Sequence, residues 1–114
     1  MAAIRELTLR IKQETQIDSP DTEFNLKFLS VVEDSRCPKG VDCIWEGNAR
    51  LQLQMSLTKT DNNFETFELN TDLEPQSYLI EGYEIKILDL VPKPIVNLII
   101  KQEDYVATFT RTNL

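Results

Sequence analysis

The chain has 114 residues, 41% hydrophobic and 27% charged, a balance typical of one globular domain rather than a disordered segment. Its formal net charge of −7 repels phosphate backbones, so we expect no nucleic-acid partner. Histidine is absent, which removes the usual general base near neutral pH and the commonest zinc ligand. We therefore expect one domain over residues 1–114 with no metal and no cofactor, and binding rather than catalysis.

Alternating apolar and polar residues predict strands in the first third of the chain. Residues 7–12 alternate in this way, which indicates a first strand with one buried face. Residues 17–22 contain Asp-Ser-Pro-Asp and predict a turn. A second strand is expected over residues 24–32, with a bulge near residues 29–31, where the apolar parity shifts.

The clearest strand pattern covers residues 49–58, where every second residue is apolar. Such alternation places one face in the core and the other in water. After a polar turn at residues 59–63, we expect residues 64–69 to form the next strand. Residues 71–77 contain a proline and are expected to be a loop.

The last third of the chain predicts two hairpins. Residues 78–80 and 83–90 flank a glycine that tolerates the positive φ of a tight connection. Pro92 and Pro94 then interrupt the pairing, because proline has no amide hydrogen to donate. We expect residues 95–100 and 105–112 to form the final hairpin.

About seven or eight short strands predict an all-β fold, a single antiparallel β-sandwich of immunoglobulin-like appearance. No apolar run approaches the roughly 18 residues of a transmembrane helix. The start of the chain, residues 1–6, has no apolar export core. We expect either a cytoplasmic protein or an extracytoplasmic mature form whose leader has been replaced. The oligomeric state stays open.

Residues 34–47 contain both cysteines, the only tryptophan and two of the three glycines. Cys37 and Cys43 can close a disulfide across a tight loop, in which Pro38 and Gly40 suit a turn. Closing this ring would stabilise the fold by roughly 2 kcal/mol. The alternative is a pair of reduced, buried thiols. The spacing does not match the Cys-x-x-Cys motif of redox proteins.

Trp45 shares its parity with the apolar face of the strand over residues 49–58. We therefore expect its indole to pack in the core beside the sulfur atoms. The alternative is an exposed platform for a sugar ring. Tyr78, Tyr83 and Tyr105 are expected to be strand residues whose hydroxyls are hydrogen-bonded.

The charged residues of this segment form a candidate binding loop: Asp34, Arg36, Lys39, Asp42 and Glu46. Carboxylates of Asp34, Asp42 and Glu46 form a calcium candidate, although no Asp-x-Asp-x-Asp pattern is present. Asp34 is expected instead to accept hydrogen bonds from loop amides or to pair with Arg36.

The motif Asp34-Ser35-Arg36-Cys37-Pro38, with Gly40-Val41, Cys43, Trp45, Gly47 and Ala49 following, resembles the signature of an uncharacterised family of small bacterial all-β domains. The Pro-x-Pro segment and the ending Tyr105-x-Ala107-Thr108 also fit. Many members carry lipoprotein-type leaders. The resemblance implies an all-β domain and an exported setting in which a Cys37–Cys43 bridge persists, and it supplies no catalytic residue.

The sequence thus favours a non-catalytic binding or interaction module for an unknown protein or small ligand. One alternative is a protease inhibitor that presents Lys39-Gly40 as a rigid, substrate-like bait. A carboxylate-based enzyme that uses Glu33, Asp34 or Glu46 is the other.

Overall fold

A computed structural model describes residues 4–18, 23–57, 64–80 and 82–113 of the protein. Eight strands and one 3-10 helix follow one another along the chain: β1 (Ile4–Arg10), β2 (Glu14–Asp18), β3 (Glu23–Asp34), β4 (Ala49–Leu57), β5 (Phe64–Asn70), β6 (Ser77–Ile80), β7 (Tyr83–Val91), η1 (Gln102–Asp104) and β8 (Val106–Asn113). Within these ranges, no helix is long and apolar enough to cross a membrane.

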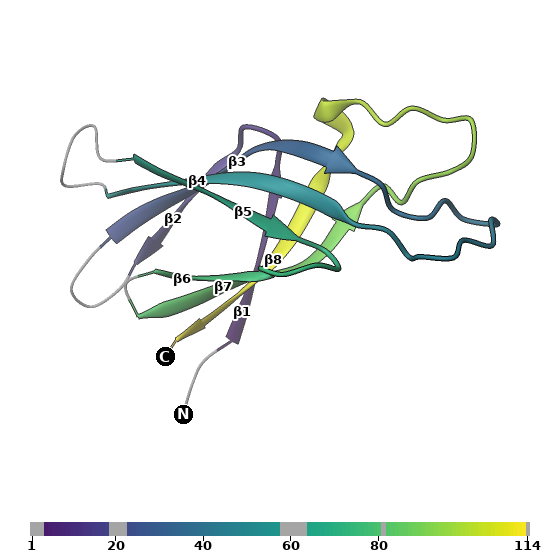
Figure 1. The fold of residues 1–114 in the computed structure, drawn as a ribbon. Helices are drawn as coiled ribbons and strands as arrows, with labels where there is room; N and C mark the ends of the chain where they lie inside the picture. The colour runs from purple at the N-terminus through teal and green to yellow at the C-terminus, as the bar shows by residue number, and fades with distance from the viewer. Residues whose placement is uncertain (1–3, 19–22, 58–63, 81, 114) are drawn as a thin grey trace.

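The strands form two antiparallel sheets of four, in the orders β1-β8-β7-β6 and β2-β3-β4-β5 (Figure 1). The predicted all-β sandwich is therefore confirmed. Apart from β1 and β8, every pair of neighbouring strands is consecutive in the sequence. The strand order is a meander and not the Greek key of immunoglobulin domains, so the predicted immunoglobulin-like appearance is not confirmed.

Side chains from both sheets fill the space between them. The Phe28 ring of β3 meets the Phe109 ring of β8 edge-on, with their centroids 6.3 Å apart. Leu51 and Leu53 of β4 are fully buried, which confirms the alternation predicted for this strand. The register of β3 against β4 shifts between Phe28 and Ser30 and again after Val31, which confirms the predicted bulge.

Strand β2 was not predicted, because its sequence carries almost no apolar alternation. Ile17 is its one buried hydrophobic residue, and the strand pairs only with β3 at the edge of its sheet. The expected turn over residues 17–22 overlaps the end of this strand, and residues 19–22 lie outside the described part of the chain. The turn expected at residues 59–63 also lies outside it.

The final hairpin predicted from residues 95–100 and 105–112 is wrong. Residues 95–100 form an irregular loop, and β8 pairs with β1 and β7 instead. The Leu98 amide donates to the Ile95 carbonyl at 3.1 Å, and Asn97 between them has a φ of 68°. This turn breaks the extended conformation that a strand requires.

Candidate functional site

Two loops lie at one end of the sandwich. We call residues 35–48, between β3 and β4, the cysteine loop, and residues 92–101, after β7, the proline loop. Figure 1 shows both projecting beyond the sheets in the same direction. They are directly connected, because the Lys39 amide donates to the Pro94 carbonyl at 3.0 Å and Lys39 forms a parallel bridge with Ile95.

The cysteine loop is closed by a disulfide between Cys37 and Cys43, whose Cα atoms are 6.0 Å apart. The predicted disulfide is therefore confirmed, and the alternative of free thiols is wrong. Two backbone bonds continue the β3–β4 pairing into the loop: Cys37 donates to the Glu46 carbonyl and Ser35 to the Asn48 carbonyl, both at 2.8 Å. The base of the loop is thus an extension of the hairpin.

Gly47 permits the close approach of the two sides of this loop. Its φ is 78°, and a Cβ atom at this position would collide with the backbone carbonyl group of Ser35. Only glycine combines the positive φ with the missing side chain. The residue therefore fixes the direction in which the loop enters β4.

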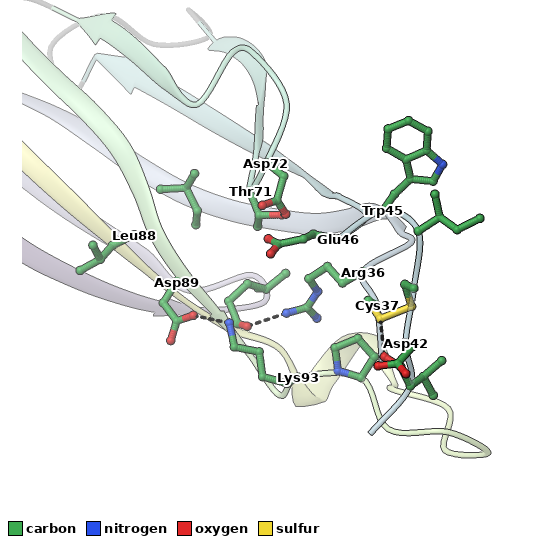
Figure 2. Close-up of a pocket in the computed structure, with 16 residues that line it drawn as sticks. Arg36, Cys37, Asp42, Trp45, Glu46, Thr71, Asp72, Leu88, Asp89 and Lys93 are labelled. Carbon is green, nitrogen blue, oxygen red and sulfur yellow. Dashed lines mark hydrogen bonds and ion pairs between the residues drawn. A yellow bond between two sulfur atoms is a disulfide. The ribbon is translucent and has the colours of Figure 1, made fainter. Parts of the chain in front are cut away.

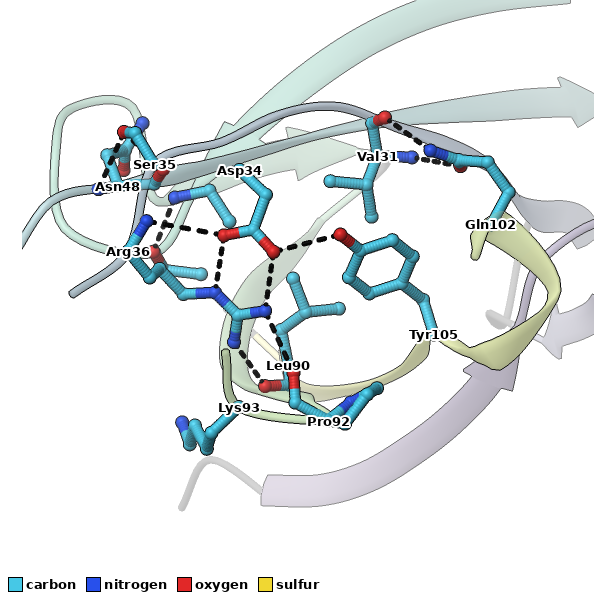
Figure 3. A network of polar contacts seen from close by, with 12 residues as sticks. Val31, Asp34, Ser35, Arg36, Asn48, Leu90, Pro92, Lys93, Gln102 and Tyr105 are labelled. Carbon is cyan, nitrogen blue, oxygen red and sulfur yellow. Dashed lines mark hydrogen bonds and ion pairs between the residues drawn. The ribbon is translucent and has the colours of Figure 1, made fainter. Parts of the chain in front are cut away.

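Asp34 and Arg36 form a bidentate ion pair at the start of the loop (Figure 3). Arg36 Nε and Nη2 each lie 2.8 Å from a carboxylate oxygen of Asp34, and the two side chains are only 7% and 14% exposed. Arg36 also donates to the carbonyls of Leu90 at 2.7 Å and Pro92 at 2.9 Å. The predicted pairing is confirmed, and it joins the cysteine loop to the end of β7.

The Tyr105 hydroxyl donates a third side-chain hydrogen bond to Asp34, at 2.8 Å from Oδ2 (Figure 3). Burial alone would raise the pKa of Asp34, but the hydrogen bonds from Arg36 and Tyr105 and the Arg36 charge lower it below its usual value. Burial and the hydrogen bond to the carboxylate raise the pKa of Tyr105 to about 12. Asp34 is therefore a carboxylate at neutral pH and Tyr105 a neutral phenol.

Gln102 fixes the far end of the proline loop. Its side-chain amide accepts from the Val31 nitrogen at 3.0 Å and donates to the Val31 oxygen at 2.9 Å (Figure 3). These two bonds to the Val31 backbone are of the kind that a neighbouring strand would make, and they lie at the bulge of β3. Both loops are thus attached to the sandwich by side chains as well as by the backbone.

The predicted core position of Trp45 is wrong, because the residue is 79% exposed. Strand β4 begins only at Ala49, and the positive φ of Gly47 turns the chain before it, so the parity of β4 does not extend back to residue 45. The neighbouring Ile44 is 91% exposed. The hydroxyls of Tyr78 and Tyr105 are both hydrogen-bonded, as the sequence predicted for these tyrosines.

Large apolar side chains gather on the two loops. The structure shows fourteen exposed large hydrophobic residues in its described ranges, and half of them lie here. We call this set the apolar loop end: Val41, Ile44, Trp45, Ile95, Val96, Leu98 and Ile99. Sequence reasoning missed its members in residues 95–99, although the flanking prolines were a signal that this apolar run was not an ordinary strand.

A groove of about 660 Å³ lies beside the cysteine loop (Figure 2). Its other walls come from Thr71 and Asp72, from residues 87–90 of β7, and from Lys93 and Pro94 of the proline loop. Lys93 Nζ lies 2.8 Å from Asp89 Oδ1, and this hydrogen bond, partly opposed by burial, lowers the pKa of Asp89. The groove therefore contains a carboxylate that is already neutralised by a neighbouring ammonium.

Asn48, which sequence reasoning also missed, holds one wall of this groove. Its buried side-chain oxygen accepts from the amides of Asp72 at 3.0 Å and Leu73 at 3.1 Å. Its amide nitrogen donates to Asn70 Oδ1 at 3.0 Å. An isolated asparagine before a strand gives no sequence signal for such a role, because its partners become neighbours only in the folded chain.

The residues of the candidate binding loop separate into two groups. Asp34 and Arg36 are largely buried in the ion pair, whereas Lys39, Asp42 and Glu46 are exposed. Asp42 and Glu46 line the groove and Asp34 does not. The calcium candidate is therefore not assembled, and the described ranges contain no group of three acidic or cysteine side chains placed to hold a metal. Glu33 lies 3.5 Å from Arg50, outside the groove.

In comparisons with known proteins, the chain matches no protein-family model, no curated protein and no solved structure. The geometry of the candidate site is therefore its main functional evidence. That geometry consists of two connected apolar loops and an adjoining acidic groove.

Proposed function

We propose that the protein is a non-catalytic binding module that contacts its partner through the apolar loop end. The observation that carries this proposal is the gathering of half the exposed large hydrophobic residues on two connected loops. Exposing such side chains to water is unfavourable, and clusters of them mark interaction sites. The best exposed members are Ile44 and Ile99, at 91% and 92%.

Two interactions that hold the base of the loops support the same function. The Cys37–Cys43 disulfide and the Asp34–Arg36 pair fix the loops before any partner arrives. A surface that is already ordered loses less conformational entropy on binding. The rigid base and the apolar surface together are typical of a preformed contact surface.

A protease inhibitor gains no support from the conformation of Lys39-Gly40. The Val41 amide donates to the Pro38 carbonyl at 3.3 Å, and Gly40 has a φ of 79°, so the two residues occupy a turn. The Lys39 amide is bound to Pro94. A substrate-like bait instead presents extended backbone with groups free to pair. A carboxylate enzyme is also unsupported, because Asp34 is held by Arg36.

We also propose an extracytoplasmic setting, since structural disulfides persist in oxidising compartments. The likeness to a bacterial family of all-β domains remains a prediction that agrees with this setting.

The binding proposal is tested by capture of partners from the source organism with the Ile44→Ser/Ile99→Ser variant and the wild type. Ile4→Ser/Leu79→Ser is the matched control, because these residues are 68% and 66% exposed and lie away from the loops. Captured proteins are fixed by chemical cross-linking. We expect a partner that is captured by the wild type and the control variant but not by the loop variant. Equal capture by all three proteins would contradict the proposal. Far-ultraviolet circular dichroism checks that each variant is folded.

A further inference from the structure

The groove beside the cysteine loop combines apolar and acidic surface. Ile44 and Trp45 stand at its rim, and Leu88 of β7, 54% exposed, contributes an apolar patch on another wall. Figure 2 shows Glu46 and Asp72 on one side of the groove and Asp89 and Lys93 on the other. A ligand in this groove therefore meets hydrophobic side chains and carboxylates together.

The charges in the groove do not balance. Its two cations, Arg36 and Lys93, are already paired with Asp34 and Asp89. Three further carboxylates, Asp42, Glu46 and Asp72, line the groove, and no ion pair in the described ranges involves them. The remaining charge is negative, and a cleft lined by one sign of charge attracts the opposite sign.

The walls that carry these groups are fixed. Asn48 binds the amides of Asp72 and Leu73, while Arg36 binds the carbonyls of Leu90 and Pro92. These bonds hold the backbone of the walls in place before a ligand binds, and preorganisation of this kind favours binding.

We propose that the groove binds an extended segment of a partner protein in which a Lys or Arg side chain stands beside a large apolar side chain. The cation lies against Glu46 and Asp72, and the apolar group packs on Ile44. An anionic lipid surface is a poorer occupant, because its headgroups meet the same carboxylates. This inference rests on the proposed binding function and specifies the chemistry of the partner.

The test uses a displayed library of random peptides, selected against the whole wild-type chain. We expect the enriched peptides to contain Lys or Arg together with a large apolar residue. A synthetic peptide from the selection should bind the Glu46→Gln/Asp72→Asn variant about tenfold more weakly. It should bind the Glu6→Gln/Glu14→Gln variant as tightly as the wild type, since this control removes the same charge from exposed residues outside the groove.

Several results would overturn the inference. The selected peptides could lack basic residues and still lose binding to the Ile44→Ser variant. This result would contradict the preference for a cation and leave the binding proposal standing. Equal weakening by the groove variant and the charge control would show a nonspecific attraction. An empty selection would overturn the peptide occupant, while the capture experiment would still decide the binding proposal separately. The wild-type protein could also sediment with phosphatidylcholine vesicles while Ile44→Ser/Ile99→Ser does not. This result would identify a lipid surface, and not a polypeptide, as the partner.

Discussion

The Tyr105 hydroxyl lies 2.8 Å from Asp34 Oδ2 and donates a hydrogen bond to it across 71 positions of sequence. The same carboxylate accepts both donors of the Arg36 fork. Since Asp34 ends β3 and Tyr105 precedes β8, these contacts join the two sheets beneath the loops. The stability of the loop end is therefore linked to a small polar network below it.

Replacing Tyr105 by Phe should lower the free energy of unfolding by about 1.5–3 kcal/mol, the usual range for a hydrogen bond to a charged group. The ring stays in place, so the loss reports the hydroxyl. Urea unfolding measures it. Tyr78→Phe is the control, because its hydroxyl donates to the exposed Glu65 at 3.0 Å, and it should change stability by well under half as much. Equal effects would contradict the importance assigned to Asp34.

The network also predicts how stability depends on pH. The pKa of Asp34 is lowered in the folded state from 3.8, so its contribution is present above that value and is lost as the pH falls through the folded pKa. The pKa of Tyr105 is raised from 10.0 to about 12, so its contribution is present below pH 10 and is lost as the pH rises toward 12.

Unfolding at a series of pH values checks this dependence. The wild type should lose more stability between pH 10 and 12 than Tyr105→Phe does. Some alkaline loss should remain in that variant, because the hydrogen bond to Glu65 also raises the pKa of Tyr78. Parallel curves for the two proteins over this interval would contradict the raised pKa of Tyr105.

Arg36→Met should destabilise the fold by about 3–5 kcal/mol, because it leaves the charge of the Asp34 carboxylate without a cation to neutralise it in a site only 14% exposed. Changing both residues, in Asp34→Asn/Arg36→Met, should recover part of this loss. Lys93→Met serves as the control, since its pair with Asp89 is half-exposed and should contribute less than about 1 kcal/mol. A double variant no more stable than Arg36→Met would contradict this explanation.

The strands that could be predicted are those with one face in the core. The alternation of β4 is such a case, and the parity shift in β3 identified its bulge because a strand must keep its apolar residues inward. β2 lacked this signal, since Ile17 is its one buried hydrophobic residue. Its position depends on pairing with β3, which local sequence does not encode.

The apolar loop end was harder to predict for a related reason. Hydrophobic residues in a sequence are normally assigned to the core, and both Trp45 and the run over residues 95–100 were assigned in this way. At a binding surface the same residues face solvent. The cysteine spacing predicted the disulfide, and the neighbouring charges predicted the Asp34–Arg36 pair. Tyr105, distant in sequence, could be added only by the folded structure.

The two loop glycines give a matched test of how the cysteine loop is built. Gly40 and Gly47 have φ values of 79° and 78°, so alanine meets the same backbone strain at each, roughly 1 kcal/mol. A Cβ at Gly40 contacts nothing within 4 Å, whereas at Gly47 it collides with the Ser35 carbonyl group. We therefore expect Gly47→Ala to lower the free energy of unfolding by several times the effect of Gly40→Ala, as measured by urea unfolding. Because the collision involves backbone, relief requires separating the two sides of the loop, and the Ser35 and Asn48 amide protons should exchange faster in Gly47→Ala. Similar stabilities and unchanged exchange would show that the close approach at Gly47 does not determine the loop.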